Sequence, residues 1–203
     1  MTDAALEAKF ESFTSGPGAR FAPDARVAWA LARSLDYGHP GLTKAAYLAH
    51  PLRVAQSYVA DAPSACAAGV ALALSHNVLE TAGSAAAPVL DKLDQRFTGV
   101  RRWVEALTID RARQSDQTYL ARYYGAIAQA GAPANEVKVL DKIDNLYLLC
   151  SNPDAAVRAA YLREIEAFVA PLADQCLPNR TSDLRALVDE ARRIGYRPAA
   201  RHD

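Results

Sequence analysis

The chain has 203 residues, of which 51% are hydrophobic, and its 23 Lys and Arg residues balance its 23 Asp and Glu residues. This length and apolar content suit one domain with its own core, and they argue against disorder and against two separate domains. The even charge argues against a broadly basic surface for DNA or RNA, although a few local cations would suffice for a small phosphorylated ligand.

Apolar residues at helical spacing, separated by Gly and Pro, predict helices along the whole chain and no strand. A short opening helix over residues 2–14 is followed by expected helices over residues 23–36, 45–60, 63–81, 85–97, 100–109, 115–130, 134–150, 153–176 and 181–195. Pro51 is expected to kink or restart the helix that contains it. The segment 63–81 is apolar on nearly all sides, which predicts a central buried helix. The fold class is therefore predicted to be all-α, as one compact domain of about nine helices over residues 1–203.

A helical stripe marks the C-terminal part of the chain. It consists of Leu162, Ile165, Phe168 and Leu172. Core packing is the favoured interpretation of this stripe, and a homo-oligomer surface is the alternative.

The N-terminus, the cysteines and the hydropathy predict a cytoplasmic protein. Residues 1–10 carry acids and no apolar stretch, so a secretory leader is not expected. Cys66, Cys150 and Cys176 are odd in number and form no CxxC pair, which favours inert thiols in a reducing compartment. No run approaches the roughly 18 apolar residues that a membrane span needs. We therefore expect neither a membrane nor a nucleic-acid partner.

The chain has only four histidines, so each can be weighed separately. His202 lies in the C-terminal tail, where no role is expected. His39 lies in a predicted Gly/Pro loop over residues 37–41 and could be a turn residue or a ligand contact. His50 precedes Pro51, which fixes the local backbone, and His76 lies near the end of the most apolar helix.

Polar side chains cluster on helices that are otherwise apolar. His76 adjoins Asn77, and Glu80 lies one turn later on the same face. A second face carries carboxylates and an amide at i, i+3 and i+4, namely Asp141, Asp144 and Asn145. Buried polar groups need partners, which a metal ion or a polar pocket would supply. Taken alone, a lone histidine is more often a hydrogen-bonded core residue, and a DxxDN cluster is more often a solvated face or a helix-packing network.

Four segments, in this order, resemble the HD superfamily, and within it the guanosine tetraphosphate hydrolase domain of the Rel/SpoT proteins and the small Mesh-type alarmone hydrolases. They are residues 47–55 (YLAHPLRVA), 73–82 (ALSHNVLETA), 97–108 (FTGVRRWVEALT) and 137–146 (VKVLDKIDNL). Their order and number make the match more specific than a lone HD dipeptide. The resemblance covers residues 24–150, and the helices of residues 151–203 are expected to pack on that part.

The resemblance implies one divalent metal ion, usually manganese in this family, held by His50, His76 and Asp141. It places Asn77 at the fourth ligand position and gives it, with Glu80, a catalytic role. Glu80 would orient or deprotonate the attacking water. The residues expected to bind the substrate are Asn145, Lys44, Arg53, Lys138, Lys142 and Asp144.

Two departures from the family pattern fall on the chemistry. Asn77 replaces the aspartate of the His-Asp pair, and Thr81 replaces the second acid of a Glu-Asp pair. An amide oxygen still suits a hard cation, but the site loses one negative charge, and Thr81 cannot act as a carboxylate base. Asp144, where the family has His or Tyr, adds an acid near Asp141.

Two functional hypotheses follow, and both expect a small-molecule nucleotide as the ligand. The first is a metal-dependent phosphohydrolase, with removal of the 3′ pyrophosphate of guanosine 3′,5′-bis(diphosphate) as the reaction that the resemblance implies. The alternative is a degenerate HD domain that binds a nucleotide or a protein partner without turnover, which Asn77 and Thr81 would favour. A purely structural helical module is a third and weaker interpretation.

Overall fold

The computed structural model describes residues 1–36 and 43–198, and helices make up most of that part of the chain. Twelve α-helices and no strand are assigned among these residues, which confirms the all-α prediction. The α-helices are α1 (Asp3–Ser15), α2 (Ala22–Arg33), α3 (Lys44–Asp61), α4 (Ala67–Ser75), α5 (Val78–Ala82), α6 (Ala87–Arg96), α7 (Val100–Leu107), α8 (Gln117–Ala130), α9 (Ala132–Leu149), α10 (Ala155–Glu164), α11 (Ala170–Cys176) and α12 (Pro178–Ile194). The predicted loop with His39 and the tail with His202 lie outside the described residues.

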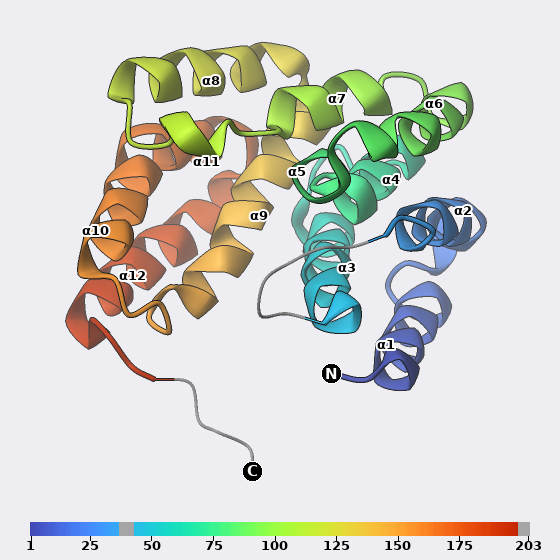
Figure 1. Cartoon of the computed structure of the whole chain (residues 1–203), viewed down its shortest axis with the longest axis horizontal. Helices are drawn as coiled ribbons and strands as arrows, with labels where there is room; N and C mark the ends of the chain where they lie inside the picture. The colour runs from blue at the N-terminus through green and yellow to red at the C-terminus, as the bar shows by residue number, and fades with distance from the viewer. Residues whose placement is uncertain (37–42, 199–203) are drawn as a thin grey trace.

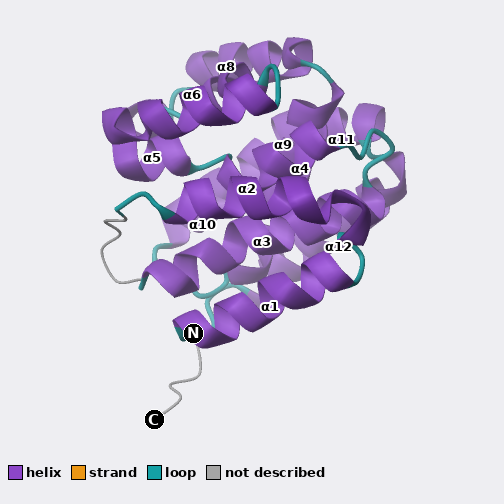
Figure 2. Ribbon diagram, turned by 90° about the vertical axis from the view of Figure 1, so that its right-hand side faces the viewer, coloured by secondary structure: helices purple, strands orange, loops and turns teal. Residues whose placement is uncertain are grey.

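Helix α9 crosses the middle of the molecule and joins its two sides (Figure 1). It packs against α3 and α4 on one side and against α11 and α12 on the other. In Figure 1, α1 and α2 lie at the opposite side of the molecule from α10 and α12, and Figure 2 views the chain from the side of α1 and α2. The C-terminal helices therefore pack directly on the part of the chain that carries the predicted site.

Helix α4 is buried on all sides, as its apolar sequence predicted. Every residue from Gly69 to Ser75 is buried, and the neighbours that cover it are α2, α3, α7 and α9. Its close approach to α3 depends on Gly69, because a Cβ there would lie 1.9 Å from the Tyr58 hydroxyl oxygen. Shortening one of these core leucines to alanine would cost about 2–5 kcal/mol of folding free energy.

The helix predicted over residues 63–81 is divided, which corrects the sequence-based prediction. Helix α4 ends at Ser75, His76 and Asn77 form a turn, and α5 begins at Val78. The side chain of His76 explains the break, since its Nδ1 lies 2.8 Å from the Ala73 carbonyl oxygen. In a continuous helix that carbonyl would accept from the backbone N–H of Asn77.

Two proline-containing segments also differ from the expected pattern. Helix α3 continues through Pro51 from Lys44 to Asp61, so Pro51 does not restart it. The helix expected over residues 153–176 is instead interrupted by a π-helical turn, Ile165–Val169, which ends two residues before Pro171. Such a turn accommodates a residue that cannot donate a backbone hydrogen bond.

The C-terminal apolar stripe packs into the core rather than forming an exposed face. Leu162, Ile165 and Leu172 are buried, and Phe168 stacks on Tyr124 of α8 with ring centroids 5.2 Å apart. Core packing, the favoured interpretation of this stripe, is therefore confirmed. In the described part of the chain, no helix has both the length and the apolar character needed to cross a membrane.

Candidate metal centre

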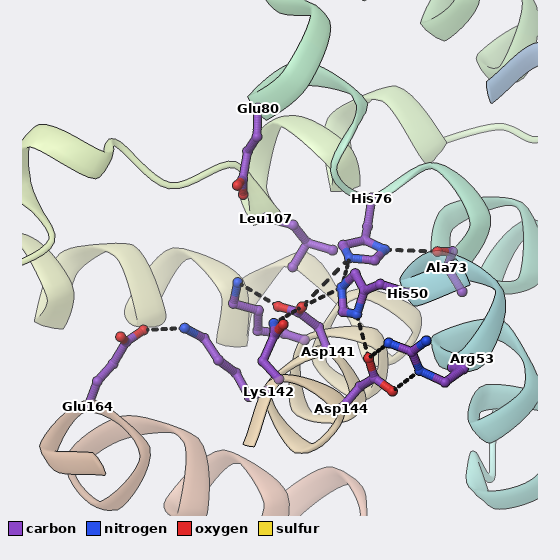
Figure 3. A network of polar contacts seen from close by, with 12 residues as sticks. His50, Arg53, Ala73, His76, Glu80, Leu107, Asp141, Lys142, Asp144 and Glu164 are labelled. Atoms are coloured by element: carbon purple, nitrogen blue, oxygen red, sulfur yellow. Dashed lines mark hydrogen bonds and ion pairs between the residues drawn. The ribbon is translucent and has the colours of Figure 1, made fainter. Parts of the chain in front are cut away.

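Three segments far apart in sequence bring His50, His76 and Asp141 together (Figure 3). His50 lies on α3, His76 lies at the turn that follows α4, and Asp141 lies on α9. One ligand atom from each of the three lies within 4.8 Å of the others. The break in the helix at His76 is part of this arrangement, because it leaves that ring at the end of a buried helix facing α3 and α9.

In their neutral forms, the two histidines present unprotonated ring nitrogens to each other. The Ala73 carbonyl oxygen can only accept, so His76 Nδ1 carries the proton and His76 Nε2 carries a lone pair. His50 Nδ1 lies 2.6 Å from Asp144 Oδ2, a carboxylate that also accepts, so the neutral His50 ring likewise turns a lone pair inward at Nε2. The two Nε2 atoms are only 3.2 Å apart.

Asp141 supplies a third electron-rich atom at the same point. Its Oδ1 lies 3.1 Å from His50 Nε2 and 3.7 Å from His76 Nε2. Burial alone would raise the pKa of Asp141, but the charge of Lys138 and the contacts with the two histidines hold that pKa well below its ordinary value. Asp141 is therefore a carboxylate, and three donor atoms converge where only a cation can relieve their repulsion.

A proton can relieve part of this repulsion in the metal-free protein. Burial would lower the pKa of His50, but hydrogen bonds to Asp141 and Asp144, together with the charges of both carboxylates, raise it to about 9. Metal binding through His50 Nε2 would therefore displace a proton below that pH.

Two further side chains fix the position of Asp141. Asn145 donates from Nδ2 to Oδ1 at 2.8 Å, and Lys138 donates from Nζ to Oδ2 at 3.2 Å. Lys138 is buried, with 4% of its surface exposed, so its charge is directed at this carboxylate. The predicted substrate-binding residues Asn145 and Lys138 thus both contact a predicted ligand.

The cluster lies in a cavity of about 950 Å³. Nearly all of the sequence-predicted site residues line it: His50, Arg53, His76, Asn77, Glu80, Lys138, Asp141, Lys142, Asp144 and Asn145. Lys44, the first residue of α3, is not among the residues that line this cavity. The four-segment pattern therefore gathers ten of the eleven predicted residues into one pocket.

The remaining charged residues of the cavity are paired. Lys142 Nζ lies 2.8 Å from Glu164 Oε1, and burial, followed by the nearby charge of Lys138, lowers the pKa of Lys142. Arg53 donates to both oxygens of Asp144 at 2.7 and 2.8 Å.

The two positions that depart from the family pattern behave differently. Asn77 is buried with 6% exposure, and its Nδ2 has no hydrogen-bond partner. Thr81 donates its hydroxyl to the Asn77 backbone carbonyl oxygen at 3.1 Å, within its own helical turn. The side-chain amide of Asn77 thus lacks a hydrogen-bond partner that a ligand in the cavity could supply. The Thr81 hydroxyl, in contrast, already has a partner within its own helix.

Glu80 reaches toward the cluster from α5 (Figure 3) and pairs with a residue that sequence reasoning missed. Its Oε2 lies 2.9 Å from the guanidinium of Arg111, which is 66% exposed at its side chain. Arg111 lies in a short turn, Arg111–Arg113, that was expected only as a polar connection. No periodic pattern marks such a residue, because only the fold brings it to the cavity.

The donor set fits a divalent transition ion. Two imidazole nitrogens and one carboxylate oxygen are the ligand types that manganese, iron and zinc accept, and three protein ligands leave positions for water and a phosphate oxygen. Both ring nitrogens that point away from the centre are hydrogen-bonded, as is usual for metal-binding histidines.

Comparison with known proteins supports the fold. No protein-family model matches the chain, and no curated protein matches its sequence. Structural similarity shows that the chain shares its all-α fold with a solved structure. One similar solved structure is that of a metazoan ortholog of SpoT, which is described as hydrolysing ppGpp and as playing a role in starvation responses. The TM-score is 0.59 at 22% sequence identity, over 87% of this chain and 96% of that one.

Proposed function

We propose that this protein is a metal-dependent phosphohydrolase that acts on a phosphorylated nucleotide, with guanosine 3′,5′-bis(diphosphate) as substrate and loss of its 3′ pyrophosphate as the reaction. The observation that carries the proposal is the convergence of His50 Nε2, His76 Nε2 and Asp141 Oδ1 in one cavity. The fold shared with the SpoT ortholog supports it. Mn²⁺ is the proposed ion, and residues 1–203 are proposed to form one domain, because α11 and α12 pack on α9.

The cavity suits a nucleotide in size and in lining. Its volume of about 950 Å³ lies within the range of small-molecule sites. Three exposed apolar side chains, Tyr147, Leu148 and Val157, lie along its lining and offer surface to a nucleobase. The exposed guanidinium of Arg111 offers bidentate donors to a phosphate.

A bound metal ion would polarise the phosphorus centre and lower the pKa of a water molecule. Glu80 is the proposed proton acceptor for the attacking water as the new oxygen–phosphorus bond forms. The bond to the ribose 3′ oxygen breaks, and that oxygen takes up a proton, so that pyrophosphate and a 3′-hydroxyl nucleotide are the products. Phosphate binding to Arg111 would release Glu80 from its ion pair. Asn77 would turn its unpaired amide toward a ligand in the cavity.

The alternative function, nucleotide binding without turnover, also has a specific observation in its favour. Asn77 brings a neutral amide where a carboxylate would bind the ion more strongly, and Thr81 is hydrogen-bonded within its helix. A domain of this kind would keep the cavity and the ligand but release no product.

Turnover in added Mn²⁺ separates the two functions. Wild-type protein is expected to release pyrophosphate, and Glu80→Gln is expected to reduce kcat by roughly 10²- to 10⁴-fold while retaining the metal. The matched control is Glu190→Gln, which changes an exposed glutamate on α12. Tight nucleotide binding by calorimetry without product in the wild type would establish the binding function instead. Equal turnover by Glu80→Gln and wild type would remove the role of Glu80.

A further inference from the structure

Asp144 connects a metal-ligand histidine to an arginine on the same helix. Its Oδ2 accepts from His50 Nδ1 at 2.6 Å and from Arg53 at 2.8 Å, and its Oδ1 accepts from Arg53 Nε at 2.7 Å. Figure 3 shows both α3 side chains, His50 and Arg53, joined to this carboxylate by dashed lines. Its side chain is 14% exposed, whereas that of Arg53 is 42% exposed.

Both oxygens of Asp144 therefore already accept hydrogen bonds from protein side chains. A carboxylate in this state offers no donor to a phosphate, and two of the Arg53 nitrogens are turned away from any ligand toward Asp144. The substrate-binding role expected for these two residues from sequence is thus not the one that their contacts favour.

The sequence spacing shows why these contacts form. Arg53 follows His50 by three residues on α3, and Asp144 follows Asp141 by three residues on α9. Helix α9 thus places a ligand, Asp141, and the partner of His50 on one face, and α3 places on one face the ligand His50 and the arginine that holds this partner. The bidentate arginine contact restricts the carboxylate to one orientation, and the carboxylate restricts His50 to one ring orientation.

We propose that Asp144, held by Arg53, is a positioning residue that keeps the Nε2 lone pair of His50 directed at the metal centre. The inference rests on the proposed metal-dependent function, and it assigns to this chain a carboxylate that acts on the ion through His50. A partner of this kind fixes the tautomer of a histidine ligand and raises its basicity as a donor. The effect strengthens His50 as a donor at a site that has an amide, Asn77, in place of a carboxylate.

A purely structural ion pair between α3 and α9 is the competing explanation. It predicts that loss of the Asp144 charge changes the stability of the metal-free protein and leaves the affinity for metal unchanged. A positioning role predicts instead that the affinity for metal changes, because the tautomer of His50 matters only for binding the ion.

The test is Mn²⁺ affinity, measured by calorimetry on the full chain at one pH, for wild type, Asp144→Asn and Asp144→Ala. The alanine variant is expected to weaken binding by roughly 10- to 100-fold. The asparagine variant should weaken it less, because its carbonyl oxygen still accepts from His50 Nδ1. Asp174→Asn is the matched control, since it removes a carboxylate from an arginine pair on α11 and α12 and should leave the affinity unchanged.

Nitrogen NMR of the histidine rings provides a readout that a structural role would not move. With Zn²⁺ bound, His50 in the wild type should show the tautomer with a proton on Nδ1, and Asp144→Ala should lose that pattern while His76 keeps it. Arg53→Met, which leaves Asp144 in place, covers the case in which both Asp144 variants fail to fold, and it should weaken Mn²⁺ binding less than Asp144→Ala.

Three results overturn the inference, and they are distinguishable. Wild-type affinity in folded Asp144→Ala would refute positioning while leaving the metal centre intact. Unchanged affinity in Arg53→Met, where only that variant folds, would refute the role of the arginine and with it the positioning pair. A wild-type protein that binds neither Mn²⁺ nor Zn²⁺ would refute the proposed function and this inference together.

Discussion

Helix α9 carries two buried polar clusters that differ in how their charges are balanced. In the first, Lys142 pairs with Glu164 at 2.8 Å, and the Tyr124 hydroxyl donates to the same carboxylate at 2.6 Å. In the second, His50, His76 and Asp141 direct three electron-rich atoms at one point. The first cluster is complete without a ligand, whereas the second needs a cation. Burial alone therefore does not mark a functional site, and the unbalanced charge distinguishes the second cluster.

The largest expected effect comes from removing a ligand of the unbalanced cluster. His76→Gln should reduce bound metal to background and abolish turnover, because one of three donor atoms is lost. Its fold should persist, since the ring satisfies only one backbone carbonyl. Elemental analysis and circular dichroism measure the two effects. Full metal content in this variant would mean that the ion lies elsewhere.

The paired cluster should respond in the opposite way. Glu164→Gln leaves Lys142 buried with a neutral partner, and loss of one charge of a buried pair costs about 3–5 kcal/mol of unfolding free energy. Metal content per folded chain should stay at the wild-type level. Denaturant unfolding measures the first quantity. A variant with wild-type stability would show that this pair does not stabilise the fold.

Restoring the negative charge that is missing at residue 77 should strengthen metal binding by the second cluster. Asn77→Asp adds a carboxylate at the turn after α4 and is expected to raise Mn²⁺ affinity by roughly tenfold, because the number of charged ligands tunes cation affinity. Calorimetry measures the gain. The control Asn135→Asp, on the far turn of α9, should show none. An unchanged affinity in Asn77→Asp would place residue 77 outside the coordination sphere.

A further expected effect is a dependence of stability on pH. The pKa of His50 in the metal-free fold, about 9, lies above its ordinary value of 6.5. Its contribution to stability is thus complete below about pH 6.5 and is lost as the pH rises through 9. With chelator present, the free energy of unfolding should fall over that range, and His50→Gln should flatten the slope. An equal slope in both proteins would assign the effect to other groups.

The sequence predicted most of the helices, since apolar spacing marks each buried face directly. It did not predict the break at His76, because there a side chain competes with the backbone for the Ala73 carbonyl. That competition depends on the ring being drawn toward α3 and α9, which local propensity does not encode.

The candidate site was predictable to the extent that each residue could be matched to a motif. His50, His76 and Asp141 come from three of the matched segments and lie together as predicted. The ion-pair partners of the other charged residues in the cavity were not predictable. Arg111 reaches Glu80 across 31 positions, and Arg53 reaches Asp144 across 91, so only the packing of the helices decides these pairs.

Metal content of protein purified without chelator tests the central claim most directly. The account predicts about one transition ion per chain in the wild type, held by three protein ligands, and background levels in Asp141→Asn. Glu166→Gln, an exposed residue paired with Arg192, should keep the wild-type content. A folded wild-type protein with no bound ion, even after incubation with excess Mn²⁺, would contradict the account.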